Sequence, residues 1–376
     1  MGGACYSVWV SLDALVMSES QELSCAAYYG TSGSGEGHGI YLQRFQAAPL
    51  RREAAGLEWR DDKAGFLRFN ASEDRLYAIA LAAEGRGLVK AFCRDKATGA
   101  LSFINEAASG GGGLCHLNLD RSERWLLGTS YGDARVTLFP LEKGGAIGPP
   151  RIAFGLEGDG SRVNALRQDA PHAHSIYADS TNRYLFVCDL GMDRIYLYAF
   201  DAESGKLEPA AIPYIETAPG SGPRHMAFHP NGRWVYAINE LNGTIVSYDW
   251  SAETAVLNPI HTVDTLPEGF SGENTTAEIV VHPSGRFVYG SNRGDDSLVA
   301  YAVDPATGGL GLLQRVPSGG AHPRHFALNA AGTLLAVANR DSDNIVYFSI
   351  EEETGLLEER GRVEGIPACT CVRILP

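Results

Sequence analysis

Arginine, histidine and glutamate residues recur at fixed distances from a turn that repeats along the chain. Arginine binds carboxylate and phosphate through planar, paired hydrogen bonds, and glutamate or histidine can transfer a proton beside them. This combination is typical of a site that binds a small anion and moves a proton on it. These residues occupy two kinds of position in each repeat: the start of the first predicted strand, and the end of the second. Together they contain His174, Arg224, His225, Glu240, Arg293, Arg324, His325 and Arg340.

A single Arg or His at a strand end is more often solvated or structurally paired than functional. Several of these positions become ionisable in the same repeats, however, which favours a shared site. We expect His172 and Asn292, which neighbour these positions in the motifs HAHS and SNRG, to contact the substrate as well. Glu240 is the first choice for proton transfer, because surrounding arginines would keep a carboxylate ionised. His174 is the alternative.

The repeat that must position these residues is clearest in the segment Gly222–Trp250, GPRHMAFHPNGRWVYAINELNGTIVSYDW. Short runs rich in aromatic and β-branched residues alternate there with Pro, Asn and Gly, as in antiparallel strands joined by tight turns. A spacing of about 50 residues with four short strands per unit is typical of propeller blades. The residue that follows the first turn of each unit is Arg75, Arg124, Arg183, Arg233, Arg286 and Thr333.

These six repeats and a shorter stretch, Ser24–Phe45, predict an all-β fold. We expect a seven-bladed β-propeller with four-stranded antiparallel blades around a central channel. Residues 1–20 should form an N-terminal extension and residues 21–376 the propeller. The first repeat lacks a strand, and an unclosed propeller would expose two sheet edges. The run Arg362–Leu375 is therefore expected to complete the first blade beside Ala26–Gly30.

The innermost strand of each blade should line the channel, so equivalent residues form rings around its axis. The ionisable residues named above fall on one arc of these rings. The opposite arc is mostly apolar and contains Phe66, Leu67, Ala82 and Cys115. Cations gathered on one side of the channel predict a binding site for a small anion, because arginine recognises carboxylate and phosphate groups. Two long loops, at residues 144–161 and 264–276, are of the kind that often covers a site.

Composition excludes several classes of partner. The formal net charge is −14, which disfavours nucleic acid and anionic membrane surfaces, and no stretch approaches the ~18–20 apolar residues of a membrane span. The seven cysteines are scattered, without a CxxC pair or a His cluster at zinc spacing. We therefore expect no metal, no cofactor and reduced thiols in a cytoplasmic protein. No Lys or Arg precedes the first apolar stretch, so a secretory signal is not predicted.

Several segments resemble the bacterial lactonase family of seven-bladed propellers: PHAHSIYAD, VCDLGMDRIYLYAFD, GPRHMAFHPNGRWVYAINE, SNRGDDSLVAYAVD and HPRHFALN. That family includes propeller-type 6-phosphogluconolactonase and is related to the fungal 3-carboxy-cis,cis-muconate lactonizing enzyme. The resemblance covers about Leu23 to Leu375. It implies that the active-site residues of the muconate enzyme correspond here to His174, Arg224, Glu240 and Arg293, which the ring positions also select.

Three functions are consistent with these residues. The first is a metal-independent lactonase acting on a sugar lactone such as 6-phosphogluconolactone, in which Arg224 and Arg293 bind the anionic groups and Glu240 or His174 activates water. The second is a cycloisomerase in which two arginines bind the carboxylates of a muconate. The third is a non-catalytic binding or scaffold propeller. The crowding of ionisable residues in the channel favours an enzyme over the third.

Overall fold

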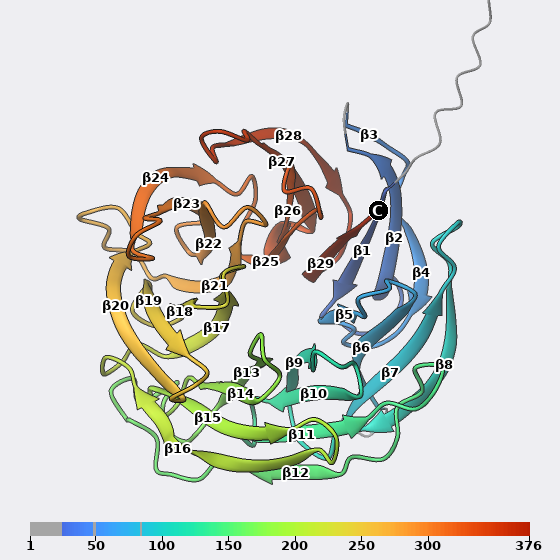
Figure 1. Ribbon diagram of the computed structural model, residues 1–376. Helices are drawn as coiled ribbons and strands as arrows, with labels where there is room; N and C mark the ends of the chain where they lie inside the picture. The colour runs from blue at the N-terminus through green and yellow to red at the C-terminus, as the bar shows by residue number, and fades with distance from the viewer. Residues whose placement is uncertain (1–24, 48–49, 83–84) are drawn as a thin grey trace, which may run out of the picture.

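The computed structural model describes residues 25–47, 50–82 and 85–376, and in them seven antiparallel sheets form a ring of blades around a central channel (Figure 1). The predicted seven-bladed β-propeller is therefore confirmed. The predicted extension, residues 1–20, lies outside the described residues. Within the described part, no helix is long and apolar enough to span a bilayer.

Blades two to seven each contain four strands that follow one another in chain order, with the first strand nearest the channel (Figure 1). The second and third blades contain β5 (Leu67–Phe69), β6 (Arg75–Leu81), β7 (Gly87–Arg94), β8 (Leu101–Ala108), β9 (Leu114–Leu119), β10 (Trp125–Ser130), β11 (Arg135–Pro140) and β12 (Ile152–Gly155). The fourth and fifth contain β13 (Ala173–Ala178), β14 (Tyr184–Asp189), β15 (Arg194–Asp201), β16 (Lys206–Glu216), β17 (Pro223–Phe228), β18 (Trp234–Asn239), β19 (Thr244–Ser251) and β20 (Val256–Asp264). The sixth and seventh contain β21 (Thr275–Val281), β22 (Phe287–Arg293), β23 (Ser297–Val303), β24 (Leu310–Pro317), β25 (Pro323–Leu328), β26 (Leu334–Asn339), the short 3₁₀ turn η1 (Arg340–Ser342), β27 (Asn344–Ile350) and β28 (Leu357–Glu364).

The first blade joins the two ends of the described chain. Its strands are β29 (Cys369–Leu375), β1 (Cys25–Thr31), β2 (Gly39–Gln46), β3 (Arg51–Arg52) and β4 (Gly56–Arg60), with β3 and β4 both paired to β2. Strand β29 runs antiparallel to β1, with Ala26 opposite Leu375 and Gly30 opposite Cys371. The segment expected to close the blade began at Arg362, but residues 362–364 belong to β28 in the last blade.

Side-chain contacts tie the first blade to both of its neighbours. The Tyr29 hydroxyl lies 2.6 Å from the Tyr347 hydroxyl of the last blade. On the other side, Arg373 Nε donates to the Leu67 carbonyl of the second blade over 2.7 Å. Tyr29 and Tyr347 are both fully buried, and a buried aromatic side chain removes roughly 150–250 Å² from water. Hydrophobic packing between blades therefore stabilises the closed ring together with the β1–β29 pairing.

The repeated turn between the first two strands of a blade is fixed by one backbone hydrogen bond. His229 N donates to the Trp234 carbonyl over 2.9 Å in the fifth blade, and Asp120 N donates to the Trp125 carbonyl over 3.1 Å in the third. The corresponding bond in the second blade runs from Asn70 N to the Arg75 carbonyl. The residue equivalent to Arg124 in the second blade is therefore the one before Arg75, so the predicted register of this blade was wrong by one residue.

This correction changes the apolar arc of the channel. Phe66, rather than Leu67, is the residue of the second blade that is equivalent to His116. The centroids of the Phe66 and His116 aromatic rings lie 4.7 Å apart. Leu67 instead is fully buried in the hydrophobic core between blades. Phe66 and Cys115 remain on the channel wall, where both line the same cavity.

The inner strands are irregular at one mouth of the channel, and this irregularity turns candidate site residues toward the channel. In the fourth, fifth and seventh blades the strand pairing skips one residue, which leaves His174, Arg224 and Arg324 without a cross-strand partner. A bulge of this kind bends the strand and redirects a side chain. Two consecutive residues can therefore face the channel, although successive side chains of a regular strand point to opposite faces.

Candidate active site

Glu240 lies at the centre of a cluster of guanidinium groups at this mouth. It follows β18 directly, and its backbone N donates to the Gly222 carbonyl over 2.7 Å. Its Oε2 lies 3.0 Å from Arg224 Nε and 2.9 Å from Arg293 Nη2, and its Oε1 lies 2.5 Å from Arg167 Nη2. Burial alone would raise the pKa of Glu240, but Arg293, Arg224 and Arg167 hold it far below its usual value. The carboxylate is therefore fixed in its ionised form.

The arginines of this cluster differ in how completely their hydrogen-bond donors are used. Arg224 Nη1 also donates to the Ala277 carbonyl over 2.6 Å, and Arg293 Nη2 donates to the Thr276 carbonyl over 2.5 Å. Arg293 Nε is buried without a partner among the described residues. Burial lowers the pKa of Arg293 to about 10, although Glu240 opposes the shift.

Arg324 forms no ion pair with a carboxylate among the described residues, although the charge of Glu240 acts on it from a greater distance. Among the described residues, no acceptor lies within hydrogen-bonding distance of its guanidinium group. Burial lowers the pKa of Arg324 to about 9, and the nearby charges of Arg224 and Arg293 add to this effect. The side chain lines the cavity described below, so an anion bound there would meet an unused guanidinium group.

Arg167 reaches the cluster from the irregular segment between β12 and β13. Its neighbour Gln168 anchors this segment: Gln168 is fully buried, and its Nε2 donates to the Leu190 carbonyl over 2.9 Å and to Asp193 Oδ1 over 2.7 Å. Burial opposes the charged form of Arg167, but Glu240 raises its pKa. The Arg167 side chain keeps 36% of its surface exposed, so it forms the solvent side of the cluster.

Tyr131 and His172 form the rim beside Arg167. Their rings stack at 4.3 Å with an angle of 5° between the planes, and the Tyr131 hydroxyl lies 3.3 Å from Arg167 Nη2. The His172 ring is held on both sides, with Nδ1 3.0 Å from the Tyr131 carbonyl and Nε2 3.2 Å from Asp169 Oδ1. Both ring nitrogens of His172 are thus occupied by the protein.

His174 differs from His172 because its ring has unused nitrogen atoms. Its Nε2 lies 4.0 Å from Glu240 Oε2, beyond hydrogen-bonding distance, and its Nδ1 is buried without a partner among the described residues. Burial lowers the pKa of His174 well below its ordinary value, and Arg224 and His225 lower it further. The imidazole is therefore neutral near pH 7, and its Nδ1 makes no hydrogen bond to the described residues.

A second buried carboxylate lies one layer deeper in the channel. Glu278 Oε1 is 3.0 Å from His225 Nδ1, and its Oε2 is 3.3 Å from His325 Nε2. The other nitrogen of His225, Nε2, lies 3.2 Å from Arg224 Nη1. If His225 Nδ1–H donates to Glu278, then Nε2 accepts from Arg224, so Glu278 orients Arg224 through His225.

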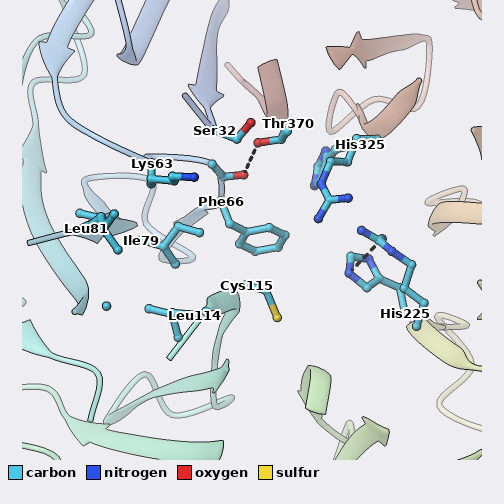
Figure 2. A pocket seen from close by; sticks show the side chains of 16 residues that line it. Ser32, Lys63, Phe66, Ile79, Leu81, Leu114, Cys115, His225, His325 and Thr370 are labelled. Atoms are coloured by element: carbon cyan, nitrogen blue, oxygen red, sulfur yellow. Dashed lines mark hydrogen bonds between the residues drawn. The ribbon is translucent and has the colours of Figure 1, made fainter. Parts of the chain in front are cut away.

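A cavity of about 380 Å³ opens beside these residues (Figure 2). Figure 2 shows Phe66 at its centre, with Ile79, Leu81 and Leu114 on one side and His225 and His325 on the other. Arg224 and Arg324 also line it, as does the exposed side chain of Lys63. Glu240, Arg293 and His174 do not line the cavity, so the cavity and the Glu240 cluster meet at Arg224. The volume is in the ~300–1,000 Å³ range of ligand pockets.

The structure brings most of the predicted site residues together. Glu240 lies within 4.0 Å of Arg224, Arg293 and His174, and His225, Arg324 and His172 surround this group. Asn292 is the exception, because its side chain is hydrogen bonded to Thr265, which follows β20, and to Ser297 on β23. Its Oδ1 accepts from Thr265 Oγ1 over 2.7 Å, and its Nδ2 donates to the Thr265 carbonyl and to Ser297 Oγ.

Two residues of the cluster were not selected from the sequence. Tyr131 occupies the ring position of Glu240 and Arg293, but an isolated tyrosine there gave no reason to choose it. Arg167 lies outside the repeat, where ring positions do not exist. The signal that could have indicated it is the long interval between the third and fourth repeats, which brings extra chain to this mouth.

Among the residues that the structure describes, no group of three or more His, Cys, Asp or Glu side chains is arranged to hold a metal ion. The donors that converge at this mouth are mainly guanidinium groups. They would bind an anion rather than a cation. The arrangement can therefore bind an anionic substrate and stabilise an oxyanion beside the unpartnered imidazole of His174.

Comparisons with known proteins agree with this architecture. The family described as lactonase, 7-bladed beta-propeller, matches residues 26–374. A 6-phosphogluconolactonase of Bacillus subtilis is 29% identical over 93% of this chain and 97% of its own length. One of Formosa agariphila is 33% identical over 79% of this chain and 84% of its own. The solved structure of a periplasmic gluconolactonase of Pseudomonas aeruginosa superposes with a TM-score of 0.87 at 27% identity, covering 94% of this chain and 99% of that one.

Proposed function

The chain belongs to the lactonase family of seven-bladed β-propellers, and from this premise we propose that it is a metal-independent lactonase that hydrolyses 6-phosphogluconolactone. Relatives named 6-phosphogluconolactonase support the reaction class. The observation that carries the choice of substrate is Arg324. Its unpaired guanidinium group lines a cavity of about 380 Å³ together with Arg224, and a phosphate group would supply the missing anion.

In the proposed reaction, the lactone carbonyl lies against Arg224 at the junction of the cavity and the Glu240 cluster. Water attacks the carbonyl carbon, and the guanidinium groups of Arg224 and Arg293 stabilise the oxyanion that forms. The ring C–O bond then breaks, which yields a hydroxyl group and a carboxylate. The phosphate group lies toward Arg324, with Lys63 on the rim of the same cavity.

His174 is the residue that we propose as proton acceptor from water and donor to the leaving ring oxygen. This reverses the first choice made from the sequence. Arg167, Arg224 and Arg293 bind both oxygens of the Glu240 carboxylate, so neither oxygen is free to accept a proton from water. His174 is neutral and has an unpartnered Nδ1. Glu240 then serves to hold Arg167, Arg224 and Arg293 in place.

We also propose that the protein acts in the cytoplasm. Among the described residues, Cys93, Cys115, Cys188, Cys369 and Cys371 form no disulfide, as is usual in a reducing compartment. A periplasmic location, as in the name of the Pseudomonas aeruginosa gluconolactonase, is the alternative. Cell fractionation with an antibody to the native protein distinguishes the two.

The proposed activity is tested by following proton release from 6-phosphogluconolactone and from unphosphorylated gluconolactone, with EDTA present and spontaneous hydrolysis subtracted. We expect hydrolysis of the phosphorylated lactone, and we expect Arg324→Gln to lower its kcat/KM about 10- to 100-fold, as for loss of a hydrogen bond to a charged group. The same variant should change kcat/KM for the neutral lactone much less.

Arg340→Gln is the matched control, because Arg340 follows β26 in the same blade and pairs with Asp341 rather than with the cluster. An equal loss on both lactones in Arg324→Gln would contradict the phosphate assignment. Turnover of a carboxymuconate in place of both lactones would identify a cycloisomerase. Binding of these compounds without turnover of any would identify a binding propeller.

A further inference from the structure

The opposite mouth of the channel carries a second group of arginines, which the proposed reaction does not use. Arg68 on β5 and Arg373 on β29 come from adjacent inner strands (Figure 1). Phe66, His225 and His325 line both the cavity beside the Glu240 cluster and a second cavity, which is also lined by Arg68 and Arg373. These rings therefore divide the channel into two separate compartments, and an anion at Arg68 would not occupy the lactonase site.

Arg68 has hydrogen-bond donors that the protein leaves unused. Its Nε is buried and lacks a partner among the described residues. Burial lowers the pKa of Arg68 to about 10, and Arg373 and Arg121 lower it further. Arg373 is held in place, because its Nε donates to the Leu67 carbonyl over 2.7 Å and its guanidinium carbon lies 5.2 Å from the centre of the Phe66 ring.

The nearby acidic residues do not neutralise this pair by direct contact. Glu278 is bound by the two histidines described above. Glu123 accepts a hydrogen bond from the backbone N of Ala71, and Asp120 accepts from Trp125 N over 2.8 Å. Arg121, the third arginine of this mouth, donates to the Asp179 and Ala178 carbonyls. Within the described part of the chain, Arg68 and Arg373 thus remain close to each other without a paired carboxylate.

Space for a ligand is present beside both side chains. Arg68 and Arg373 line a cavity of about 360 Å³ with Asn118, Tyr177 and Glu278 on its walls. They also line an adjoining cavity of about 370 Å³ that extends toward Arg121 and Glu123. Both volumes exceed what a phosphate or carboxylate group requires, so a small molecule bearing such a group fits.

We propose that Arg68 and Arg373 form a second anion site, at the mouth opposite the lactonase site, which binds a small oxyanion through a phosphate or carboxylate group. Arg68 supplies its Nε and terminal nitrogens to paired oxygens of the ligand. Arg373 contributes a second positive charge from the facing strand. Two unpaired guanidinium groups repel each other, and a bound anion removes that repulsion.

The test is titration calorimetry with inorganic phosphate, and with acetate in a parallel arm, in the Arg324→Gln background so that the lactonase site is weakened. We expect one site for at least one of these anions. Adding Arg68→Gln should weaken that site about 10-fold or more. Adding Arg121→Gln instead should leave it nearly unchanged, because Arg121 already serves backbone carbonyls. The arm with the tighter binding identifies the ligand group as phosphate or carboxylate.

Thermal unfolding with and without the anion separates loss of binding from a folding defect, because the shift in Tm caused by the anion is measured within each variant. The anion should raise the Tm of Arg324→Gln and of Arg324→Gln/Arg121→Gln, but not of Arg324→Gln/Arg68→Gln. Binding that survives Arg68→Gln, or the absence of binding in Arg324→Gln, overturns the proposal. Neither readout uses lactone turnover, so failure of the lactonase assay would not affect this result.

Discussion

Glu240 and Glu278 are two buried glutamates of neighbouring blades, and the protein holds them in opposite ways. Glu240 binds three guanidinium groups, whereas Glu278 binds two imidazoles. Burial lowers the pKa of His225 and of His325 well below the ordinary value, so both rings are neutral near pH 7. One carboxylate therefore sits among permanent charges, and the other among neutral hydrogen-bond donors.

The histidines beside the two carboxylates differ in the same way. His174 lies 4.0 Å from Glu240 and keeps Nδ1 unpartnered, while His225 is hydrogen bonded through both nitrogens, to Glu278 and to Arg224. A free imidazole can exchange a proton with substrate, and a tied imidazole can only position its neighbours. The comparison thus separates a reacting group from an orienting group within one channel.

The largest effect should come from removing the free imidazole. His174→Ala is expected to lower kcat on 6-phosphogluconolactone by on the order of 10²–10⁴-fold, the usual contribution of general acid–base catalysis, with a much smaller change in KM. Steady-state kinetics of the variant measure both. The exposed His261→Gln serves as control, since His261 lies on the outer strand β20. A kcat near that of the wild type would remove His174 from the reaction.

The next effect concerns folding rather than turnover. Glu240→Gln leaves three guanidinium groups without their buried counter-charge, and loss of one partner of a buried ion pair costs about 3–5 kcal/mol. Denaturant titration measures the free energy of unfolding. Glu278→Gln should cost less, because the amide oxygen still accepts from one neutral imidazole and only the other imidazole loses its acceptor. If Glu278→Gln is the more destabilised variant, the contrast between charged and neutral surroundings is wrong.

Glu278→Gln also tests whether Glu278 orients Arg224 through His225. A weakened Glu278–His225 hydrogen bond costs about 1–3 kcal/mol when a buried donor loses its partner, and it frees His225 to turn its ring. We expect KM for the phosphorylated lactone to rise by about 10-fold, with kcat changed less. Glu278→Asp, which restores the charge, should recover part of the affinity. A selective loss of kcat would instead place Glu278 in the reaction.

The fold could be predicted from the sequence because each blade repeats the same turn and the same short apolar strands. The register error in the second blade arose because Arg75 was aligned with Arg124, which is also an arginine after a turn. The turn hydrogen bond ends on the Trp125 carbonyl in the third blade and on the Arg75 carbonyl in the second, so Arg75 is equivalent to Trp125. Residue type alone does not show which of two neighbouring positions closes a turn.

The candidate site could be predicted only where it lies on the repeat. His174, Arg224 and Arg324 stand at equivalent positions, and a bulge turns each of them into the channel. Arg167 was missed because its position depends on how buried Gln168 anchors an irregular segment. Asn292 was misleading, because its neighbour Arg293 reaches the cluster while its own amide bonds to Thr265 and Ser297.

The smallest expected effect is on the pH dependence of stability, and it tests whether the imidazoles at Glu278 are neutral. Burial lowers the pKa of His325 in the folded protein, whereas the unfolded chain keeps a value near 6.5. Below about pH 6.5 the unfolded chain binds a proton that the folded protein excludes, so the free energy of unfolding falls as pH decreases. One such histidine contributes about 1.4 kcal/mol per pH unit. His325→Gln keeps a donor for Glu278 but cannot titrate, so its free energy of unfolding should fall less steeply than that of the wild type between pH 6 and pH 5. Denaturant titrations at pH 8 give the constant offset between the two proteins, and the difference in slope below pH 6.5 gives the proton count. Equal slopes would mean that His325 is protonated in the folded protein, and Glu278 would then lie in an ion pair as Glu240 does.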